Sequence, residues 1–346
     1  MSGLDVAPGV RPAAGLNVAS GAQFTAILGF GGYRPRRVVD NAEICTLIDS
    51  TDEWIRTRSG IIERRWAAPD ETIQMMSVAA ARKALDRSGV AAGQIDTVIV
   101  STVTHLHQTP AVATTIATEL GAQGAAAFDI SAACAGFCYA TAMADSFIRS
   151  GASKYVLIIG VERLSDLTDK HDRSSAFLFA DGAGAAVVGP SELAGIGPVV
   201  WGSDGEQAPL IGQSQAWDTA VRVEGQAVWP TLRMDGNPVF KWASFSMAKT
   251  AAEAMDAAGV RPEDLNVFAP HQANMRITDA MFRALKLPSD VVVARDIARQ
   301  GNTSAASIPL AIEALLESGE AQSGDTCLII GFGAGLVYAG QVIVLP

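Results

Sequence analysis

Residues 155–160, with the sequence YVLIIG, recur 171 positions later as residues 326–331, with the sequence TCLIIG. A second pair of segments has nearly the same displacement: KALDRSGV at 83–90 resembles EAMDAAGV at 253–260, 170 positions further on. One such match is explained by chance similarity of helix–glycine–strand patterns, but two in the same order indicate an internal repeat. The sequence therefore predicts a fold built from two duplicated α/β units.

The repeat sets the predicted organisation of the chain. We expect a flexible N-terminal tail (1–22), an N-terminal half (23–197) and a C-terminal half (198–346). Strands alternate with helices in both halves, which predicts a layered α/β fold with its reactive groups in the cleft between the halves. Projecting the repeat places Cys134 opposite residues 301–304, so that two helix starts face one another across a pseudo-two-fold axis.

Composition limits the classes of function. Of 346 residues, 49% are hydrophobic and 18% are charged, as in a well-packed α/β enzyme. The net charge of −10 argues against nucleic-acid binding and requires local arginines for any anionic ligand. The 4 scattered cysteines suit a reducing compartment, and we expect a cytoplasmic protein. No apolar run approaches the roughly 18 residues of a membrane span, and residues 1–22 lack the pattern of a signal peptide.

Local signals place several elements of the N-terminal half. Residues 24–28 and 95–100 have the apolar, β-branched composition of buried strands. Ser50 and Glu53 have the spacing of a capping box, which predicts a short helix after them that ends at a glycine. Apolar residues recur with helical period over 77–88, and a glycine again follows.

Cys134 is the candidate nucleophile. It follows the apolar segment 128–130 and precedes the small, apolar run 135–148, so a strand should end and a helix begin at this residue. Unpaired N–H groups and the positive end of the helix dipole there favour a thiolate over a thiol. The alternative is a buried small hydrophobe, the usual role of cysteine among alanines, and we assign that role to Cys138.

The 4 histidines differ in their settings. His271 follows the apolar segment 267–270 and is well placed to enter a cleft, although a lone histidine there is more often a core residue. His105 and His107 form a His-x-His pair, but no Cys, Asp or Glu stands at ligand spacing, so we expect no metal. His171 lies between charged residues and is expected in a solvated loop.

Three motifs support a more specific interpretation: AACAGF at 132–137, PHQAN at 270–274 and GNTSAAS at 301–307. Together they closely resemble β-ketoacyl-acyl carrier protein synthase III, the thiolase-fold condensing enzyme that initiates bacterial fatty-acid synthesis. The resemblance runs from about residue 24 to the C-terminus. It implies a thiolase-like fold with two duplicated halves in a layered αβαβα arrangement, and a homodimer. The other matching segments are TDEWI at 51–55, DGAGAA at 181–186 and GFGAG at 331–335.

The resemblance implies a catalytic triad of Cys134, His271 and Asn302. Cys134 would take the acyl group of an acyl-CoA and release CoA. Malonyl-acyl carrier protein would then bind, and His271 and Asn302 would donate hydrogen bonds to its thioester carbonyl as CO₂ departs. The carbanion would attack the acyl-enzyme and give 3-oxoacyl-acyl carrier protein. Backbone N–H groups of Cys134, Gly333 and Ala334 would form the oxyanion hole, and no metal or cofactor is needed.

The same resemblance implies two binding surfaces. The residues expected to bind CoA are Trp54, Arg58, Arg173 and Arg276. The residues expected to bind the carrier protein are Gln272, Ala273, Asn274, Met275, Arg276, Lys241 and Arg283. Without the motifs these would be ordinary surface residues. With them, the basic side chains supply the local positive charge that CoA and an acidic carrier protein require.

Two residues are expected to line the acyl pocket, Thr109 and Phe332. Thr109 precedes Pro110 roughly where some members of the family carry a bulky aromatic residue. A smaller side chain leaves more room, so we hypothesise that primers longer than acetyl, or branched ones, are accepted.

Other functions remain to be weighed. The closest alternative is a starter-unit condensing enzyme or acyltransferase of secondary metabolism, although His271 and Asn302 together favour decarboxylative condensation. A biosynthetic thiolase would need a second cysteine as base, and a redox sensor would use Cys134 only as a reactive thiol. A Rossmann dehydrogenase and a serine hydrolase are disfavoured, because G-x-G-x-x-G after an early strand and G-x-S-x-G are both missing.

Overall fold

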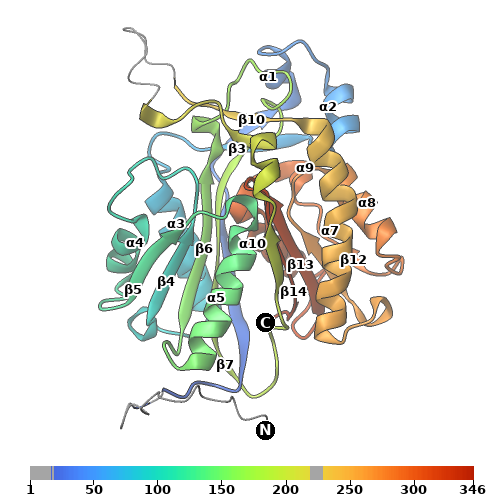
Figure 1. Ribbon diagram of the computed structural model, residues 1–346. Helices are drawn as coiled ribbons and strands as arrows, with labels where there is room; N and C mark the ends of the chain where they lie inside the picture. The colour runs from blue at the N-terminus through green and yellow to red at the C-terminus, as the bar shows by residue number, and fades with distance from the viewer. Residues whose placement is uncertain (1–16, 18, 219–228) are drawn as a thin grey trace, which may run out of the picture.

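The computed structural model describes residue 17, residues 19–218 and residues 229–346, which form two five-stranded sheets (Figure 1). Across the first sheet the strands are β1 (Phe24–Tyr33), β7 (Asp181–Ser191), β6 (Val156–Arg163), β4 (Thr97–Ser101) and β5 (Ala126–Ile130). Across the second they are β8 (Val200–Ser203), β14 (Val337–Val344), β13 (Thr326–Gly333), β11 (Val267–Pro270) and β12 (Val292–Val293).

The two sheets have the same connectivity. In the first, β4 pairs in parallel with β5 and β6, and β7 pairs antiparallel with β6 and β1. In the second, β11 pairs in parallel with β12 and β13, and β14 pairs antiparallel with β13 and β8. The predicted thiolase-like fold of two duplicated halves is therefore confirmed.

Helices form the other three layers of the αβαβα arrangement (Figure 1). Between the sheets lie α5 (Gly136–Ser150) and α10 (Ser307–Ser318), each preceded by one 3-10 turn, η2 (Ala133–Ala135) and η6 (Ser304–Ala306). The outer helices are α3 (Ile73–Ser88) and α4 (Val112–Leu120) on the first sheet, and α7 (Gly236–Ala258) and α8 (Met275–Ala284) on the second.

Both faces of each sheet are buried, which explains the unbroken apolar runs of the repeated segments. On β6, Val156 and Ile158 pack in the core around α5 and α10, whereas Leu157 and Ile159 pack under α3 and α4. Strand β13 alternates in the same way between the central core and the core under α7 and α8.

Two glycines allow the halves to pack closely at their seam, which is the contact between the central strand of each half and the helix start of the other. A Cβ atom on Gly160 of β6 would lie 2.1 Å from the carbonyl oxygen of Ala305, in the opposite half. A Cβ atom on Gly331 of β13 would lie 2.8 Å from Cα of Ala135, again across the seam. Each central strand thus needs a glycine where the other half's helix start packs against it, so both repeated segments end in glycine.

The remaining elements lie beside this framework, and α1, α2, β3 and β10 lie above the two sheets (Figure 1). The strands are β2 (Arg37–Asp40), β3 (Glu63–Trp66), β9 (Ile211–Gln213) and β10 (Leu232–Met234). The helices are α1 (Asn41–Cys45), α2 (Asp52–Ser59), α9 (Ile297–Gln300), η1 (Ala92–Gln94), η3 (Leu164–Asp166), η4 (Gly205–Leu210) and η5 (Pro262–Asp264).

The predicted capping box is wrong by one residue. Thr51, not Ser50, caps α2, because its hydroxyl accepts a hydrogen bond from the Trp54 amide at 3.1 Å. The Ser50 hydroxyl is buried and has no hydrogen-bond partner among the described residues. The short helix itself is confirmed.

The other local predictions are confirmed with small shifts of their ends. Strand 24–28 extends to Tyr33 as β1, and strand 95–100 is β4. Helix 77–88 begins earlier, at Ile73, where Thr72 caps it, and stops at Gly89 in the left-handed conformation, as predicted.

Most of the predicted tail, residues 1–22, lies outside the described residues. At its end, the Ala22 amide donates to the Ile148 carbonyl of α5 at 3.2 Å, so this residue is tied to the core. Across the described residues, no helix combines the length and the apolar character that a bilayer crossing demands.

Candidate active site

Cys134 lies in η2, directly before α5, at the point where β5 leads into the central layer. The preceding Ala133 has φ +43°, and Ser304, at the matching position of η6, has φ +48°. Such left-handed conformations are unfavourable for residues other than glycine and are maintained at functional turns by the surrounding packing. The strained turn is thus a shared feature of both helix starts.

Two cavities meet at Cys134. The first, of about 330 Å³, opens between α2 and α7 and reaches His271, Asn302 and Phe332. The second, of about 620 Å³, lies toward β5 and is lined in part by Phe128 and Ser304. The thiol is therefore accessible from two directions.

His271 follows β11 and is 2% exposed. Its Nδ1 lies 2.7 Å from the Ser307 hydroxyl, which also accepts a hydrogen bond from the Gln272 amide at 3.3 Å. The hydroxyl proton is then free to go to Nδ1, which leaves the proton of the neutral ring on Nε2. Burial lowers the pKa of His271 to about 3, so the ring is neutral at pH 7. His271 is thus suited to donate a hydrogen bond from Nε2.

Asn302 enters the same cavity from the loop before η6 and is 6% exposed. Its Oδ1 accepts a hydrogen bond from the Ser304 amide at 2.9 Å, which fixes the side-chain amide. Its backbone is held by the first half: the Asn302 amide donates to Leu178 O at 2.9 Å, and Ala180 N donates to Asn302 O at 2.8 Å. The Nδ2 group remains available as a donor beside Cys134 and His271.

The protonation state of Cys134 differs from the expectation. Burial raises the pKa of its thiol to about 12; the hydrogen bond with Ser304 opposes this shift and the charge of Glu162 adds to it. The predicted resting thiolate is therefore wrong for the ligand-free protein, because burial outweighs the helix start. A proton must leave the sulfur when it reacts.

The turn after β13 packs directly against the thiol. A Cβ atom on Gly333 would lie 2.9 Å from Cys134 N and 3.1 Å from Cys134 Sγ, so only glycine fits. Ala334 lines the second cavity next to Cys134. This is the position that the predicted oxyanion hole requires, and that role stays a prediction.

The expected CoA residues gather at the mouth of the first cavity. The Arg173 and Arg58 guanidinium carbons lie 4.8 and 5.8 Å from the centre of the Trp54 ring. Phe177 packs edge-on against the same ring, with centroids 5.4 Å apart. Arg58 and Arg276 line the cavity itself. The mouth thus combines an aromatic face with three positive charges.

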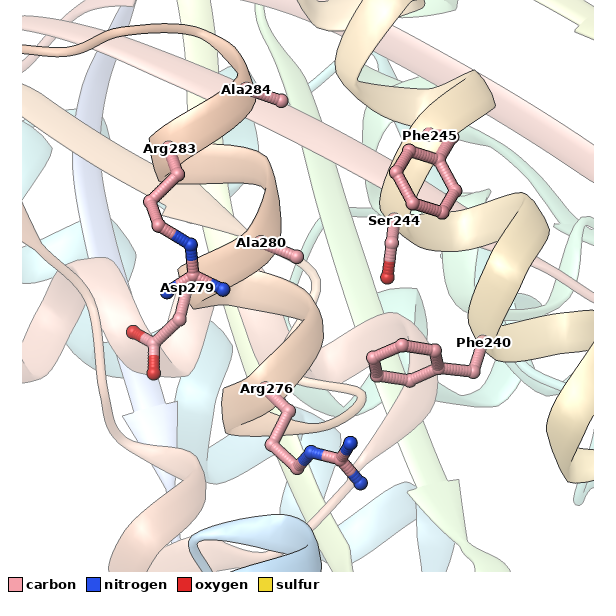
Figure 2. A pocket seen from close by; sticks show the side chains of 8 residues that line it. All are labelled: Phe240, Ser244, Phe245, Arg276, Asp279, Ala280, Arg283 and Ala284. Atoms are coloured by element: carbon pink, nitrogen blue, oxygen red, sulfur yellow. The ribbon is translucent and has the colours of Figure 1, made fainter.

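The expected carrier-protein residues fall into two groups: exposed residues on α7 and α8, and residues 272–275, which make contacts inside the protein. Arg276, Asp279 and Arg283 lie on α8 and line an open groove between α7 and α8, where Arg276 reaches toward Phe240 and Arg283 lies beside Asp279 (Figure 2). Phe240 and Phe245 reach this groove from α7, where Phe245 is 71% exposed and the Arg276 guanidinium lies 5.0 Å from the Phe240 ring centre. Lys241 is exposed on α7.

The assignment of Gln272 to a docking surface is wrong. Its side chain is 1% exposed, and its Nε2 donates to Pro270 O and Ala294 O at 2.8 and 3.2 Å. Its Oε1 accepts from the Ile297 amide at 3.2 Å. Because every polar atom of this amide is used inside the protein, Gln272 cannot contact a partner.

The three residues after Gln272 also make internal contacts. Asn274 caps α8, accepting from Arg276 N at 2.9 Å and donating to Arg58 O at 2.9 Å. Met275 packs against the hydrophobic cluster that contains Ile55 and Phe177, and Ala273 lines the first cavity. Asn274 thus positions Arg58 and Arg276, while the docking role of all three residues stays a prediction.

The two expected acyl-pocket residues lie far apart in structure. Phe332 is 4% exposed, and its ring is edge-on to His271 with centroids 5.4 Å apart, beside the first cavity. Thr109 is exposed and lines neither cavity that reaches Cys134. Within one chain, the structure does not bring Thr109 to the thiol.

His105 and His107 stack with ring centroids 5.6 Å apart. In the part of the chain that the structure describes, no three His, Cys, Asp or Glu side chains gather as a metal site would require.

Three residues near the thiol were not singled out from the sequence: Glu162, Ser304 and Ser307. Glu162 is fully buried at the end of β6. A charged residue directly after the apolar run 156–161 was the available signal, because buried strands rarely end in an uncompensated carboxylate. The two serines stood within a recognised motif, but their contacts depend on the fold.

The comparisons with known proteins agree with this geometry. A family model described as 3-oxoacyl-[acyl-carrier-protein (ACP)] synthase III matches residues 128–205, and one described as its C terminal matches residues 255–345. β-Ketoacyl-[acyl-carrier-protein] synthase III 1 of Streptomyces coelicolor is 57% identical over 337 residues, covering 95% of this chain and 98% of that protein. The Streptomyces glaucescens β-ketoacyl-[acyl-carrier-protein] synthase III is 59% identical over 328 residues, with coverage of 95% and 98%. Among solved structures, the priming β-ketosynthase from the R1128 polyketide biosynthetic pathway superimposes with a TM-score of 0.93 at 52% identity, covering 96% of this chain and 99% of that one.

Proposed function

The chain belongs to the 3-oxoacyl-[acyl-carrier-protein] synthase III family, and from this premise we propose that it condenses a short acyl-CoA primer with malonyl-acyl carrier protein. The products are 3-oxoacyl-acyl carrier protein, CoA and CO₂. The observation that carries the proposal is the convergence of Cys134, His271 and Asn302 on one cavity whose mouth holds Trp54 and Arg58.

Acyl transfer to Cys134 is the first step. The CoA thioester enters through the first cavity, with the adenine against Trp54 and the phosphates near Arg58, Arg173 and Arg276. Sulfur attack forms a tetrahedral intermediate whose oxyanion is held by backbone N–H groups at Cys134 and the Gly333–Ala334 turn. Loss of CoA leaves the acyl-enzyme, with the acyl chain in the second cavity.

Condensation follows in the same cavity. The malonyl thioester carbonyl accepts hydrogen bonds from His271 Nε2 and Asn302 Nδ2, which stabilise the enolate as CO₂ leaves. The low pKa of His271, about 3, keeps this donor neutral. The carbanion then attacks the acyl group on Cys134 and forms the new carbon–carbon bond.

The second cavity supports primers longer than acetyl. Its volume of about 620 Å³ is far more than an acetyl group fills, and apolar side chains such as Phe128 and Leu164 line part of it. Longer and branched chains gain from burial against these residues by roughly 0.8 kcal/mol per methylene.

A homodimer is part of the proposal. Strand β5 is the edge of its sheet, and all of its residues but Ala126 are partly buried. An unpaired edge strand readily pairs with a second chain. A second copy at this edge would close the second cavity and would give the exposed Thr109 a route to a thiol that its own chain does not offer.

The carrier protein is proposed to dock on the groove between α7 and α8 (Figure 2). Arg276 and Arg283 suit an acidic surface, and Phe240 and Phe245 offer apolar contact beside them. The 4 cysteines are all free, which suits the reducing cytoplasm as the place of action.

A specific observation favours a second candidate function. The priming β-ketosynthase of the R1128 polyketide pathway shares this fold with a TM-score of 0.93 and 52% identity. We therefore keep starter-unit condensation in secondary metabolism as the alternative. It uses the same chemistry and differs in the primer and the carrier protein.

One assay tests both. The protein is incubated with acetyl-, isobutyryl- and longer acyl-CoA, and intact mass is measured before and after addition of malonyl-acyl carrier protein. We expect an acyl adduct on Cys134 and then 3-oxoacyl-acyl carrier protein, with primers larger than acetyl preferred. An adduct without any condensation product would contradict the proposal, and a strong preference for acetyl-CoA would contradict the primer assignment.

A further inference from the structure

Glu162 is a buried carboxyl group that the proposed chemistry has not used. It lies on the face of β6 toward the central layer, two residues after the seam glycine Gly160, and is 0% exposed. Among the described residues no lysine, arginine or histidine forms an ion pair with it. Burying a carboxylate without a counter-charge is costly, so its presence here requires a reason.

Four groups donate hydrogen bonds to this carboxyl. Thr104 Oγ1 lies 2.6 Å from Oε2, the Val103 amide 3.1 Å and Thr102 Oγ1 3.3 Å from the same oxygen. Ser304 Oγ lies 3.2 Å from the other oxygen, Oε1. The Val103 amide also lies 3.3 Å from Oε1, so among the described residues Ser304 is the one side chain that donates to this oxygen.

Ser304 connects the carboxyl to the nucleophile. Both residues line the second cavity, and the Ser304 hydroxyl acts on the Cys134 thiol, whose pKa it lowers. A hydroxyl has one proton and two lone pairs, so Ser304 can donate to Glu162 while it accepts from the thiol. The left-handed backbone of Ser304, with φ +48°, aims the side chain at Glu162 while the amide holds Asn302.

We propose that Ser304 and Glu162 form a proton path that takes the proton from Cys134 while the acyl-enzyme forms. As the sulfur attacks, the S–H proton moves to Ser304 Oγ and the Ser304 O–H proton moves to the Glu162 carboxylate. The sulfur electron pair forms the bond to the acyl carbon, and the bond from that carbon to the CoA sulfur breaks. The proton returns through Ser304 to the CoA sulfur, which leaves as a thiol. The inference rests on the proposed function, since it concerns its first step.

The surroundings support this role over His271. The His271 ring already has Nδ1 bonded to Ser307, and its Nε2–H is needed as a donor in the second step. Burial raises the pKa of Glu162 to about 7, whereas its four hydrogen-bond donors oppose that shift. A base whose pKa is near the working pH is the most effective proton acceptor.

The groups that face Glu162 come from three elements: the segment after β4 (Thr102 to Thr104), η6 (Ser304) and, beyond Ser304, η2 with Cys134. The negative charge of Glu162 raises the pKa of the Cys134 thiol, so the two groups act on each other. The two groups therefore share one proton path, and a substitution at one should alter the titration of the other.

The test compares Glu162→Gln with the parent and with Thr102→Val, which removes a hydrogen bond to the carboxyl outside the path. Single-turnover acylation is measured with an acyl-CoA and with p-nitrophenyl acetate, which needs no CoA recognition. Alkylation of Cys134 by iodoacetamide is measured across pH as a separate report on thiolate formation. We expect acylation of Glu162→Gln at pH 7.5 to fall by roughly 100-fold. The alkylation midpoint should move to lower pH, because the opposing negative charge is gone, and Thr102→Val should change acylation less than about 3-fold.

The opposite signs make the outcome decisive. If acylation rises together with alkylation, Glu162 only opposes the thiolate and the proton path is overturned; if both fall together, its role is structural and the proposal is again overturned. Ser304→Ala keeps the charge and breaks the path, so it must slow acylation by a similar factor even if Glu162→Gln does not fold. A parent protein that is acylated by p-nitrophenyl acetate but by no acyl-CoA would contradict the proposed function. The proton path would then still be tested by the acylation rates of the variants with p-nitrophenyl acetate.

Discussion

The two helix starts at the centre of the molecule have the same backbone and different side chains. Residues 131–136 read SAACAG and residues 302–307 read NTSAAS, and both contain a left-handed residue, Ala133 with φ +43° and Ser304 with φ +48°. The first start carries the thiol. The second carries an amide and two hydroxyls, and alanine stands where the first has cysteine. The repeat supplied one scaffold twice, and each copy keeps a different part of the chemistry.

The central strands β6 and β13 show the same combination of a shared backbone and different side chains. Gly160 and Gly331 occupy the same position and accept the opposite helix start in the same way. Two residues later the halves diverge: Gly333 leaves room for Cys134, whereas Glu162 fills the matching place beneath Ser304. The backbone packing of the two halves is therefore symmetric, whereas the buried carboxyl group is present in the first half only.

Moving the nucleophile would test this asymmetry most severely. Cys134→Ala should abolish the acyl-enzyme and lower condensation by at least ~10³-fold. Adding Ala305→Cys to that variant restores a thiol at the matching position, but His271 and Asn302 line the cavity at Cys134, which does not include Ala305, so activity should not return. Intact mass and product formation are the measurements. A double variant with appreciable condensation would show that the two helix starts are interchangeable.

Removing the donors of the second half should separate the two steps. His271→Ala and Asn302→Ala should each lower condensation by roughly 10²–10³-fold, because each loses one hydrogen bond to the developing enolate. Acyl-enzyme formation should change much less, since neither His271 nor Asn302 has a proposed role in that step. Stopped-time mass measurements distinguish the steps. Equal losses in both steps would contradict the division of labour.

Filling the seam glycines tests the symmetry of shape. Gly160→Ala and Gly331→Ala each force a Cβ atom against backbone of the opposite half, and each should destabilise the protein by about 2–3 kcal/mol. Gly93→Ala, which meets nothing within 4 Å, is the matched control. Denaturant unfolding of the three variants gives the answer. A large loss for only one seam glycine would mean that the two contacts differ in tightness.

The asymmetry of charge predicts opposite pH dependences. The pKa of His271 is lowered to about 3, so below its ordinary value the unfolded chain binds a proton that the folded chain refuses, and stability falls as the pH drops. The pKa of Glu162 is raised to about 7, so above its ordinary value the folded chain retains a proton that the unfolded chain has released, and stability falls as the pH rises.

Each slope should disappear with its own residue. His271→Gln should flatten the loss of stability between pH 6.5 and 4.5, and Glu162→Gln should flatten the loss between pH 4.5 and 7, by about 2–3 kcal/mol each. Unfolding free energies measured across this range are the check. The exposed His107→Gln variant serves as control. Parallel effects of the two buried substitutions would refute the assigned signs.

The smallest effect is expected at the groove on α8. Arg283→Glu should raise the KM for malonyl-acyl carrier protein by roughly 3–10-fold at low salt, with the difference shrinking at high salt. Acylation from acyl-CoA should not change. The exposed Arg82→Glu on α3 carries the same charge change away from the groove. An equal effect of both variants would assign the loss to net charge rather than to docking.

The sequence predicted those features that depend on pattern. The repeated apolar runs gave both sheets, and motif residues at strand ends and helix starts gave the positions of Cys134, His271 and Asn302. Features that depend on register were missed. Whether Glu162 faces the central layer is decided by the alternation along β6. Gln272 lies in the loop after β11, and its side chain turns inward although both of its neighbours line the first cavity.

The wrong capping residue of α2 is an error of a single position. Ser50 and Thr51 are both good caps, and only the start of α2 at Asp52 selects the second. The thiol state was misjudged for another reason: a helix start is visible in a sequence, but the depth to which packing encloses a sulfur is not.

The glycines of β6 and β13 also determine how the protein can be divided. Each half has an open notch that only the other half's turn fills, so neither half has a finished surface of its own. A chain cut between β7 and β8 should therefore yield two fragments that assemble with each other rather than two independent domains, and recombination between relatives should succeed only when both notches and both turns are inherited together.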